Sequence, residues 1–156
     1  ALTICGDGGA YAIGLGETMA AATRNENVTF FVMNNTVYGM TGGQMAPTTM
    51  IGQRTTSSKD GRILADSGEN FDVVKIMRGL AIAYLARTSV TNPANVAKTK
   101  KYVRKALEKQ RDCKGFSLVE VLVPCPTNWG MTPPKSMEYI NDVMTKQYEL
   151  GEFIDR

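Results

Sequence analysis

A glycine-rich junction near the N-terminus constrains the fold more than any other feature of the chain. The segment ICGDGGAYAIGLGE (residues 4–17) leads from an apolar run through Gly-Asp-Gly-Gly into an alanine- and methionine-rich stretch. A short apolar run bounded by turn residues is typical of a buried strand, and the longer alanine-rich stretch favours a helix. We therefore expect a strand at Leu2–Cys5, a tight turn at Gly6–Gly9 and a helix at Ala10–Arg24.

Apolar runs and helical segments continue to alternate along the rest of the chain. Further strands are predicted at 28–33, 82–87 and 116–124, and further helices at 71–80, 93–111 and 136–150. Alternation of strands with helices is typical of α/β architecture, in which the strands are mostly parallel. We therefore expect an α/β fold with a mostly parallel sheet and helices on both faces.

Finer signals add detail to this outline. Asn92 suits the N-cap of the 93–111 helix. The mostly apolar stripe of this helix is predicted to consist of Val96, Val103, Ala106, Leu107 and Gln110. Residues 34–70 form a polar stretch with six glycines. A loop of this length inside a compact domain is usually functional or disordered.

Composition excludes several classes of function. The chain has 156 residues, a net charge of +3, three cysteines and no histidine. No apolar run reaches the roughly 18 residues of a membrane-spanning helix, and the mild charge does not indicate a nucleic-acid partner. Without histidine, Ser-His-Asp and Cys-His catalysis are excluded within this chain. An odd number of unpaired cysteines fits a reducing cytoplasm better than a disulfide framework.

The length suits one domain, residues 1–156. Because the first residues already read as a strand and no initiating Met precedes them, we expect this domain to be truncated at its N-terminus.

Two polar motifs follow the first two predicted strands. Asp7 follows the first strand, and the Asn34-Asn35 pair follows the second. Ligands of open parallel sheets bind at the carboxyl ends of the strands. If these strands are neighbours, Asp7 and Asn35 converge on one point, where their oxygens suit Mg²⁺ or Ca²⁺. The glycines and the start of the following helix would then seat a diphosphate.

Simpler interpretations of the same residues remain open at this point. Gly-Asp-Gly alone is usually a turn, and Asn-Asn after a strand is usually a loop start or a cap. A dinucleotide fingerprint does not fit, because Tyr11 stands where its third glycine would be. A phosphate-binding P-loop does not fit either, because no Gly-Lys-Ser/Thr follows.

The two motifs together resemble the fingerprint of thiamine diphosphate-binding proteins, in which Gly-Asp-Gly is followed by Asn-Asn at this spacing. Here 25 residues (9–33) separate them. The resemblance implies the thiamine diphosphate-binding fold, and it implies that Asp7, Asn35 and the carbonyl of Val37 hold Mg²⁺. It also implies that the diphosphate lies against Gly8 and Gly9, and that Gly6 of the same turn belongs to the cofactor-binding site.

A narrower resemblance follows from NNTVYGMTGGQMAPTT (residues 34–49) and VEVLVPCPTNWGMTPPKSMEYI (residues 119–140). Both are similar to the β subunit of 2-oxoacid:ferredoxin oxidoreductases, although Ala46 replaces a common serine. By this resemblance Tyr38, Gly39 and Thr41 belong to the loop that closes over the diphosphate.

Cys125 corresponds, by the same resemblance, to one ligand of a four-iron, four-sulfur cluster. Other ligands belong to a Cys-x-x-Cys element upstream, which this chain does not contain. Because one thiolate cannot hold such a cluster, we expect it only in the full-length subunit. Cys5 and Cys113 are not at ligand positions, and we interpret them as a small core residue and a turn residue.

The resemblance further implies oxidative decarboxylation of a 2-oxoacid to acyl-CoA and CO₂, with electrons passing to ferredoxin. The implied partners are coenzyme A, ferredoxin and an α subunit that carries the pyrimidine-binding domain. The segments CPTNWGMTP and SMEYI resemble the 2-oxoisovalerate and 2-oxoglutarate members of the family more than the pyruvate members, which implies one of the first two substrates. No catalytic residue is predicted in this chain.

Other interpretations are kept beside this one. The chain could instead be a non-oxidative thiamine diphosphate enzyme of the acetolactate synthase or decarboxylase type, or a diphosphate-binding module that catalyses nothing in isolation. The basic helix 98–111 could dock ferredoxin, but a solvated face is the preferred interpretation. The roles of Arg54, Lys59 and Arg62 in the long loop stay open.

Overall fold

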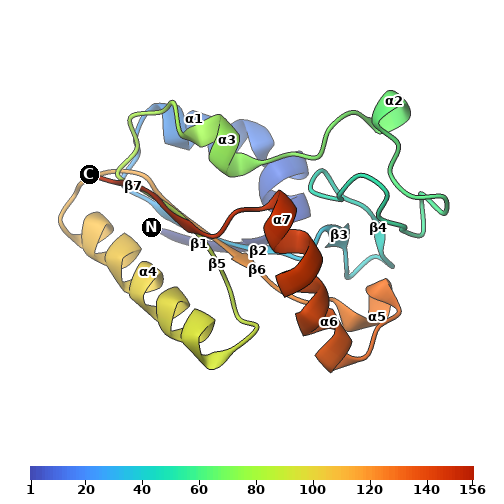
Figure 1. Ribbon diagram of the computed structural model, residues 1–156. Coiled ribbons are helices and arrows are strands. Elements are labelled where there is room, and N and C mark those ends of the chain that lie inside the picture. Colours follow the sequence, from blue (N-terminus) through green and yellow to red (C-terminus); the bar gives the residue numbers. More distant parts are fainter.

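The computed structural model describes every residue of the chain, 1–156, and is built around a five-stranded sheet in the order β1–β2–β6–β5–β7 (Figure 1). The strands are β1 (Leu2–Gly6), β2 (Thr29–Asn34), β5 (Tyr84–Ser89), β6 (Ser117–Leu122) and β7 (Gly151–Asp155). The pairs β1–β2, β2–β6 and β5–β6 are parallel, whereas β5 and β7 are antiparallel. The prediction of a mostly parallel sheet is confirmed.

Helices cover both faces of this sheet, as predicted (Figure 1). Helices α1 (Leu15–Thr23) and α3 (Val73–Met77) lie on one face, and the long α4 (Pro93–Arg111) lies on the other. A C-terminal helical segment leads into β7. It consists of α6 (Pro133–Tyr139), the π-helix η2 (Ile140–Met144) and α7 (Thr145–Gln147). The remaining elements are the π-helix η1 (Gly9–Ile13), the hairpin strands β3 (Val37–Tyr38) and β4 (Gln44–Met45), α2 (Leu64–Ser67) and α5 (Pro126–Trp129).

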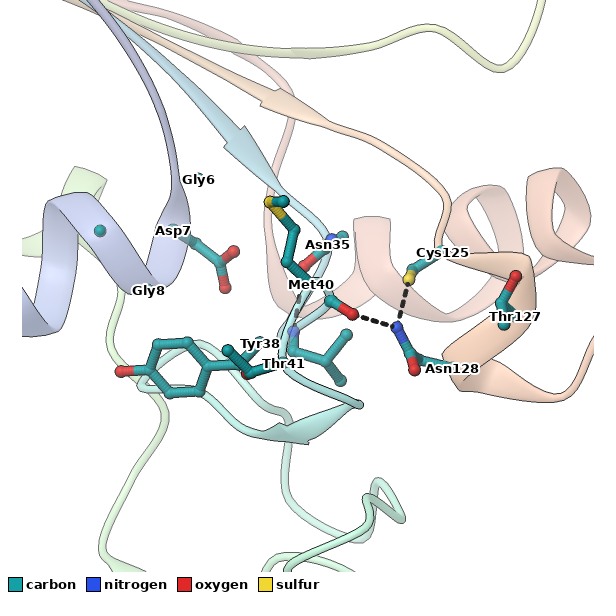
Figure 2. A pocket seen from close by; sticks show the side chains of 13 residues that line it. Gly6, Asp7, Gly8, Asn35, Tyr38, Met40, Thr41, Cys125, Thr127 and Asn128 are labelled. Atoms are coloured by element: carbon teal, nitrogen blue, oxygen red, sulfur yellow. Dashed lines mark hydrogen bonds between the residues drawn. The ribbon is translucent and has the colours of Figure 1, made fainter.

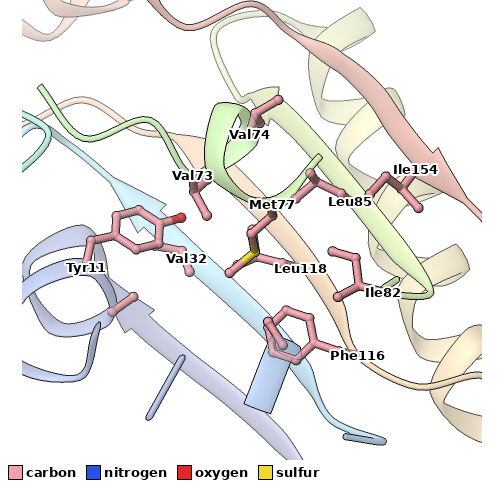
Figure 3. Close-up of a cluster of buried hydrophobic side chains, with 12 residues drawn as sticks. Tyr11, Val32, Val73, Val74, Met77, Ile82, Leu85, Phe116, Leu118 and Ile154 are labelled. Carbon is pink, nitrogen blue, oxygen red and sulfur yellow. The ribbon is translucent and has the colours of Figure 1, made fainter. Parts of the chain in front are cut away.

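Two buried clusters fill the layers above and below the sheet. Successive side chains of a strand point to opposite faces. Leu118 of β6 therefore packs with Met77 of α3 in the larger cluster (Figure 3), whereas the next residue, Val119, packs in the second cluster with Ala106 of α4. Every residue of β6 is buried. This explains why FSLVEVLVP is nearly continuous in apolar residues, as expected of a central strand of a parallel sheet.

One ion pair lies inside these central strands. Arg87 of β5 and Glu120 of β6 face each other in register, and each is 1% exposed. The Arg87 Nε donates to Glu120, and its Nη2 lies 2.6 Å from Oδ1 of Asp72. Contact between opposite charges offsets the cost of removing each from water.

Several predicted boundaries are wrong where local signals are weak. The predicted helix Ala10–Arg24 divides into η1 and α1, with the break at Gly14. The last helix begins at Pro133 rather than Ser136, since proline suits a first helical turn. It ends at Gln147 rather than Leu150, and the short strand β7 that follows is not predicted from the sequence.

The structure confirms the predicted N-cap of helix α4 and partly corrects its predicted apolar stripe. The Asn92 Oδ1 accepts the N–H of Asn95 at 2.9 Å, as an N-cap does. Ala106 is buried and Val103 packs against the second cluster, as predicted, but Leu107 is 42% exposed, and Tyr102, which is outside the predicted stripe, also packs against that cluster. No helix combines the length and the apolar character that crossing a membrane requires.

Candidate functional site

The carboxyl ends of β1 and β2 meet at one cavity of about 630 Å³. These strands are direct neighbours, with Gly6 paired to Met33. Asp7 follows β1 and Asn35 follows β2, and Figure 2 shows both side chains at this cavity. The fold therefore brings the two motifs together at one cavity. The cavity is lined by all nine residues predicted to contact the cofactor or metal, namely Gly6, Asp7, Gly8, Gly9, Asn35, Val37, Tyr38, Gly39 and Thr41, and also by Cys125.

Asp7 is a buried carboxylate with an altered affinity for protons. It is 2% exposed, and burial raises its pKa to about 6. The hydroxyl of Thr48 and the backbone N–H groups of Asp7 and Gly8 act in the opposite direction, whereas the negative charge of Glu120 adds to the increase. Because burial penalises the charged form, a cation bound beside Asp7 would stabilise its carboxylate.

The two asparagines have different roles. Asn34 is fully buried, and its Nδ2 donates to Oε1 of Glu120 at 3.0 Å. Asn35 instead lines the cavity, and its Oδ1 accepts the N–H of Val37 at 3.2 Å. Only the second asparagine therefore presents its side chain to a ligand in the cavity. An amide oxygen has two lone pairs, so Oδ1 can accept this bond and bind a metal ion at the same time.

Glycines let two backbone segments approach each other at the cavity. A Cβ on Gly8 would lie 2.2 Å from the ring of Tyr38, and a Cβ on Gly39 would lie 3.2 Å from Nδ2 of Asn35. The chain turns directly from β1 into the helical segment that begins at Asp7 and continues through η1. The first N–H groups of a helix have no partners within it, and they favour an anion.

The far wall of the cavity comes from α5 and the residue before it. The Asn128 Nδ2 donates to the carbonyl of Gly39 at 2.9 Å and to Sγ of Cys125 at 3.2 Å (Figure 2). The Trp129 Nε1 donates to the carbonyl of Asn35 at 3.2 Å. Helix α5 thus holds the loop that carries Asn35 at two points. The sequence analysis predicts no helix in this segment and assigns no role to Asn128 or Trp129.

Thr48 is a second residue that sequence reasoning overlooks. It is fully buried, and its hydroxyl donates to Oδ2 of Asp7. Thr48 belongs to the APTT stretch that carries part of the family resemblance. That stretch is the one signal in the sequence that could have found it, since no local pattern connects two residues 41 positions apart.

The predicted long loop is ordered by Arg62, whose role the sequence leaves open. Arg62 is 6% exposed. Its guanidinium donates to six backbone carbonyls, those of Ala46, Pro47, Thr49, Ser67, Gly68 and Glu69. It therefore holds the loop together and has no free donor to offer a substrate. Arg54 and Lys59 are exposed.

The remaining cysteines fit the interpretations drawn from the sequence. Cys5 is half-buried against the larger cluster, and burial raises the pKa of its thiol. Cys113 is exposed in the turn after α4, with a φ of 54°. Neither residue lines the cavity.

The donors at the cavity suit a magnesium diphosphate. No group of three His, Cys, Asp or Glu side chains could hold a metal ion. Mg²⁺ does not need such a cage, because it is usually bound by one or two carboxylates together with phosphates of the ligand. Asp7, the amide oxygen of Asn35 and the glycine turn supply what such a ligand requires. Cys125 is the only cysteine at the cavity, so this chain by itself does not provide the ligands of a four-iron cluster.

Comparisons with known proteins identify relatives over most of the chain. The chain is 42% identical to the ketoisovalerate oxidoreductase subunit VorA of Methanothermobacter marburgensis, over 97% of this chain and 32% of the relative. It is 35% identical to the 2-oxoglutarate synthase subunit KorB of Archaeoglobus fulgidus, over 88% of this chain and 47% of that subunit. The chain thus spans about a third to a half of the length of these relatives.

A solved structure shows the same fold. It is a 2-oxoglutarate:ferredoxin oxidoreductase from Magnetococcus marinus with 2-oxoglutarate, coenzyme A and succinyl-CoA bound. The match covers 97% of this chain and 55% of the chain in that structure, with a TM-score of 0.72 and 19% sequence identity. Residues 1–121 match the family described as the C-terminal TPP binding domain of thiamine pyrophosphate enzymes. This match covers well over half of the chain, and the chain therefore belongs to that family of thiamine diphosphate-binding domains.

Proposed function

We propose that this chain is the diphosphate-binding domain of the β subunit of a 2-oxoacid:ferredoxin oxidoreductase. One observation carries the proposal. Asp7 and Asn35 follow adjacent parallel strands and line the same cavity, beside a glycine turn and the start of a helix. Family membership supports thiamine diphosphate as the ligand.

Three oxygens are proposed to bind Mg²⁺. They are a carboxylate oxygen of Asp7, Oδ1 of Asn35 and the backbone carbonyl of Val37, all from residues that line the cavity. The diphosphate would lie against Gly8 and Gly9, where the absence of side chains and the start of a helical segment favour close approach of an anion. The loop that contains Tyr38 and Thr41 would cover it from the other side.

When bound, thiamine diphosphate supplies the carbanion chemistry that decarboxylates a 2-oxoacid. The residues of this chain position that group. Thr48 and the helical N–H groups keep the Asp7 carboxylate in place. Gln44 restrains Thr41, because its Nε2 donates to the Thr41 carbonyl at 2.8 Å and its Oε1 accepts the Thr41 hydroxyl at 2.7 Å. Catalytic residues that act on the substrate are proposed to lie outside this chain.

The proposed reaction converts a 2-oxoacid and coenzyme A to acyl-CoA and CO₂, and two electrons pass to ferredoxin. Among the relatives, the one named for ketoisovalerate is more similar to this chain than the one named for 2-oxoglutarate. This favours 2-oxoisovalerate as the substrate. We further propose a cytoplasmic complex with an α subunit that carries the pyrimidine-binding domain.

Cys125 is proposed to be one ligand of an iron–sulfur cluster whose other ligands come from outside these 156 residues. Its half-buried thiol lies at the cavity wall, beside Asn128. This placement would put the cluster next to the cofactor, which suits electron transfer between them.

Calorimetric titration of the chain with thiamine diphosphate and Mg²⁺ tests the core of the proposal. We expect binding that requires Mg²⁺ and is lost in Asp7→Ala. The matched control is Asp60→Ala, which removes an exposed acid outside the cavity and should bind as the unaltered chain does. Equal heats for Asp7→Ala and the unaltered chain would reject the proposed metal site.

A further inference from the structure

Thr36 lies between two of the proposed metal-binding residues and has an unusual backbone conformation. Its φ is +62°, in the left-handed region, and the residue is fully buried. Residues with a branched Cβ rarely adopt positive φ, because the side chain meets the backbone there. Such a conformation persists only where the surrounding structure imposes it, and it is found preferentially at functional sites.

Every polar group of Thr36 is hydrogen-bonded. Its N–H donates to Oδ1 of Asn34 at 3.0 Å, and its carbonyl accepts the hydroxyl of Thr49 at 2.5 Å. Its own hydroxyl donates to the carbonyl of Asn35 at 2.7 Å and accepts from Nε2 of Gln53 at 2.7 Å. These four bonds impose the unfavourable φ.

The residues on each side of Thr36 are also held by hydrogen bonds. The Asn35 carbonyl accepts from the Thr36 hydroxyl and also from Nε1 of Trp129 at 3.2 Å. With its carbonyl held from two directions, Asn35 has its side chain at the cavity (Figure 2). On the other side, the N–H of Val37 is held by Oδ1 of Asn35 at 3.2 Å.

We propose that Thr36 is a positioning residue whose hydroxyl, held by Gln53, sets Asn35 and Val37 in the geometry that binds the metal before the metal arrives. This inference rests on the proposed function, because it assumes that both residues ligate Mg²⁺. A preorganised site binds more tightly, because less order has to be imposed on binding.

Calorimetry with thiamine diphosphate and Mg²⁺ on Thr36→Val and Thr36→Ser tests the role of the hydroxyl. Loss of a group that orients metal ligands typically weakens metal affinity about 10–100-fold. We expect a loss of that size in Thr36→Val and a loss of less than about threefold in Thr36→Ser. Thr56→Val is the matched control, because Thr56 is exposed in the same loop and should bind as the unaltered chain does.

Gln53→Met provides a second route, in case Thr36→Val does not fold. It removes the donor to the Thr36 hydroxyl from a partly exposed position, and it should also weaken binding about tenfold. Circular dichroism and thermal unfolding without metal would establish that each compared variant is folded. Binding within threefold of the unaltered chain by both Thr36→Val and Gln53→Met would overturn the inference, as would equal losses in Thr36→Ser and Thr36→Val.

Asp7→Ala separates this inference from the proposed function. If Asp7→Ala abolishes binding while Thr36→Val and Gln53→Met bind normally, only the role of Thr36 is refuted. If the unaltered chain shows no Mg²⁺-dependent binding, or if Asp7→Ala binds equally well, the proposed site fails and this inference fails with it.

Discussion

The ring of Tyr38 lies directly against the backbone of Gly8, where the turn after β1 meets the loop after β2. A Cβ on residue 8 would be 2.2 Å from Cε1 and 2.6 Å from Cδ1 of that ring. Both distances are far shorter than van der Waals contact, so no side chain fits there unless the ring moves. The contact connects the glycine turn to the loop that carries Asn35, and both line the cavity.

Gly8→Ala should therefore weaken diphosphate binding without unfolding the protein. The new methyl group would displace Tyr38 and occupy space against which the diphosphate is proposed to lie. We expect a loss of at least about tenfold in Mg²⁺-dependent affinity for thiamine diphosphate, equivalent to about 1.4 kcal/mol. Gly16→Ala is the control, because a Cβ added to Gly16 of α1 would meet no atom within 4 Å, and Ala is favoured over Gly in a helix. Unchanged affinity in Gly8→Ala would show that this contact does not shape the binding site.

Asp7→Asn should stabilise the metal-free protein at neutral pH. The folded-state pKa of Asp7 is about 6, above the unfolded value of about 3.9. A raised pKa contributes stability that is fully present below about pH 4 and is lost as the pH rises through about 6. At pH 8 the buried charge should therefore cost roughly 2–3 kcal/mol, and the neutral amide of Asn avoids this cost.

Urea unfolding of both proteins with a chelator present, at pH 4 and pH 8, measures this effect. We expect Asp7→Asn to be the more stable protein at pH 8 and nearly equal to the unaltered chain at pH 4. A stability difference that does not change between the two pH values would contradict the link between Asp7 and protonation. The same substitution should abolish Mg²⁺ binding, so that stability and function change in opposite directions.

Arg87→Met should destabilise the fold strongly. Arg87 contacts Glu120 and Asp72, and all three side chains are buried. Removing the cation leaves two buried carboxylates without their partner, and breaking a buried pair in this way typically costs about 3–5 kcal/mol. Arg24→Ala is the control, because its pair with Glu26 is exposed and should contribute less than about 1 kcal/mol.

Denaturant unfolding checks this prediction, and a double variant refines it. In Arg87→Met/Glu120→Gln only Asp72 is left unpaired, so the double variant should recover part of the loss. Equal stability of Arg87→Met and Arg24→Ala would indicate that the buried pair is not formed in solution.

Arg62→Met should loosen the segment between β4 and α3. The Arg62 guanidinium is the common partner of six backbone carbonyls in this segment. Hydrogen bonds from a charged donor contribute about 1.5–3 kcal/mol each but are not additive, since water replaces part of them. We expect a global loss of about 2–4 kcal/mol and faster amide exchange between residues 46 and 70.

Hydrogen exchange followed by mass spectrometry would locate the change. Arg54→Met, in the same segment but exposed, should leave the exchange pattern unaltered. If Arg62→Met exchanged no faster than the control, the loop would have to be held by other contacts.

Local sequence signals predicted the features of the fold that depend on neighbouring residues. The alternation of apolar runs with helical segments predicted the parallel strands, and Asn92 marked the start of α4. Signals failed where a segment is short or irregular. GEFID is too short to identify as strand β7, and Gly14 gave no clear indication that η1 and α1 would be separate.

The candidate site was predictable only in part, for a related reason. Asp7 and Asn35 stand out because each follows an apolar strand in a recognisable motif. Their supporting residues come from distant segments without a local pattern: Thr48 contacts Asp7 across 41 positions, and Trp129 contacts Asn35 across 94.

The order of residues along the chain is enough to predict most of the helices and strands, and also the strand ends that carry polar groups. Strand and helix preferences, capping and turn formation all act over a few neighbouring residues, so each leaves a local pattern in the sequence. Packing in three dimensions was needed to establish that Thr48 contacts Asp7 and Trp129 contacts Asn35, that Arg62 holds the loop, and that Thr36 is forced to a positive φ. Those outcomes depend on which side chains the packed sheet and loops bring together, and contacts between residues far apart in the chain have no local signature.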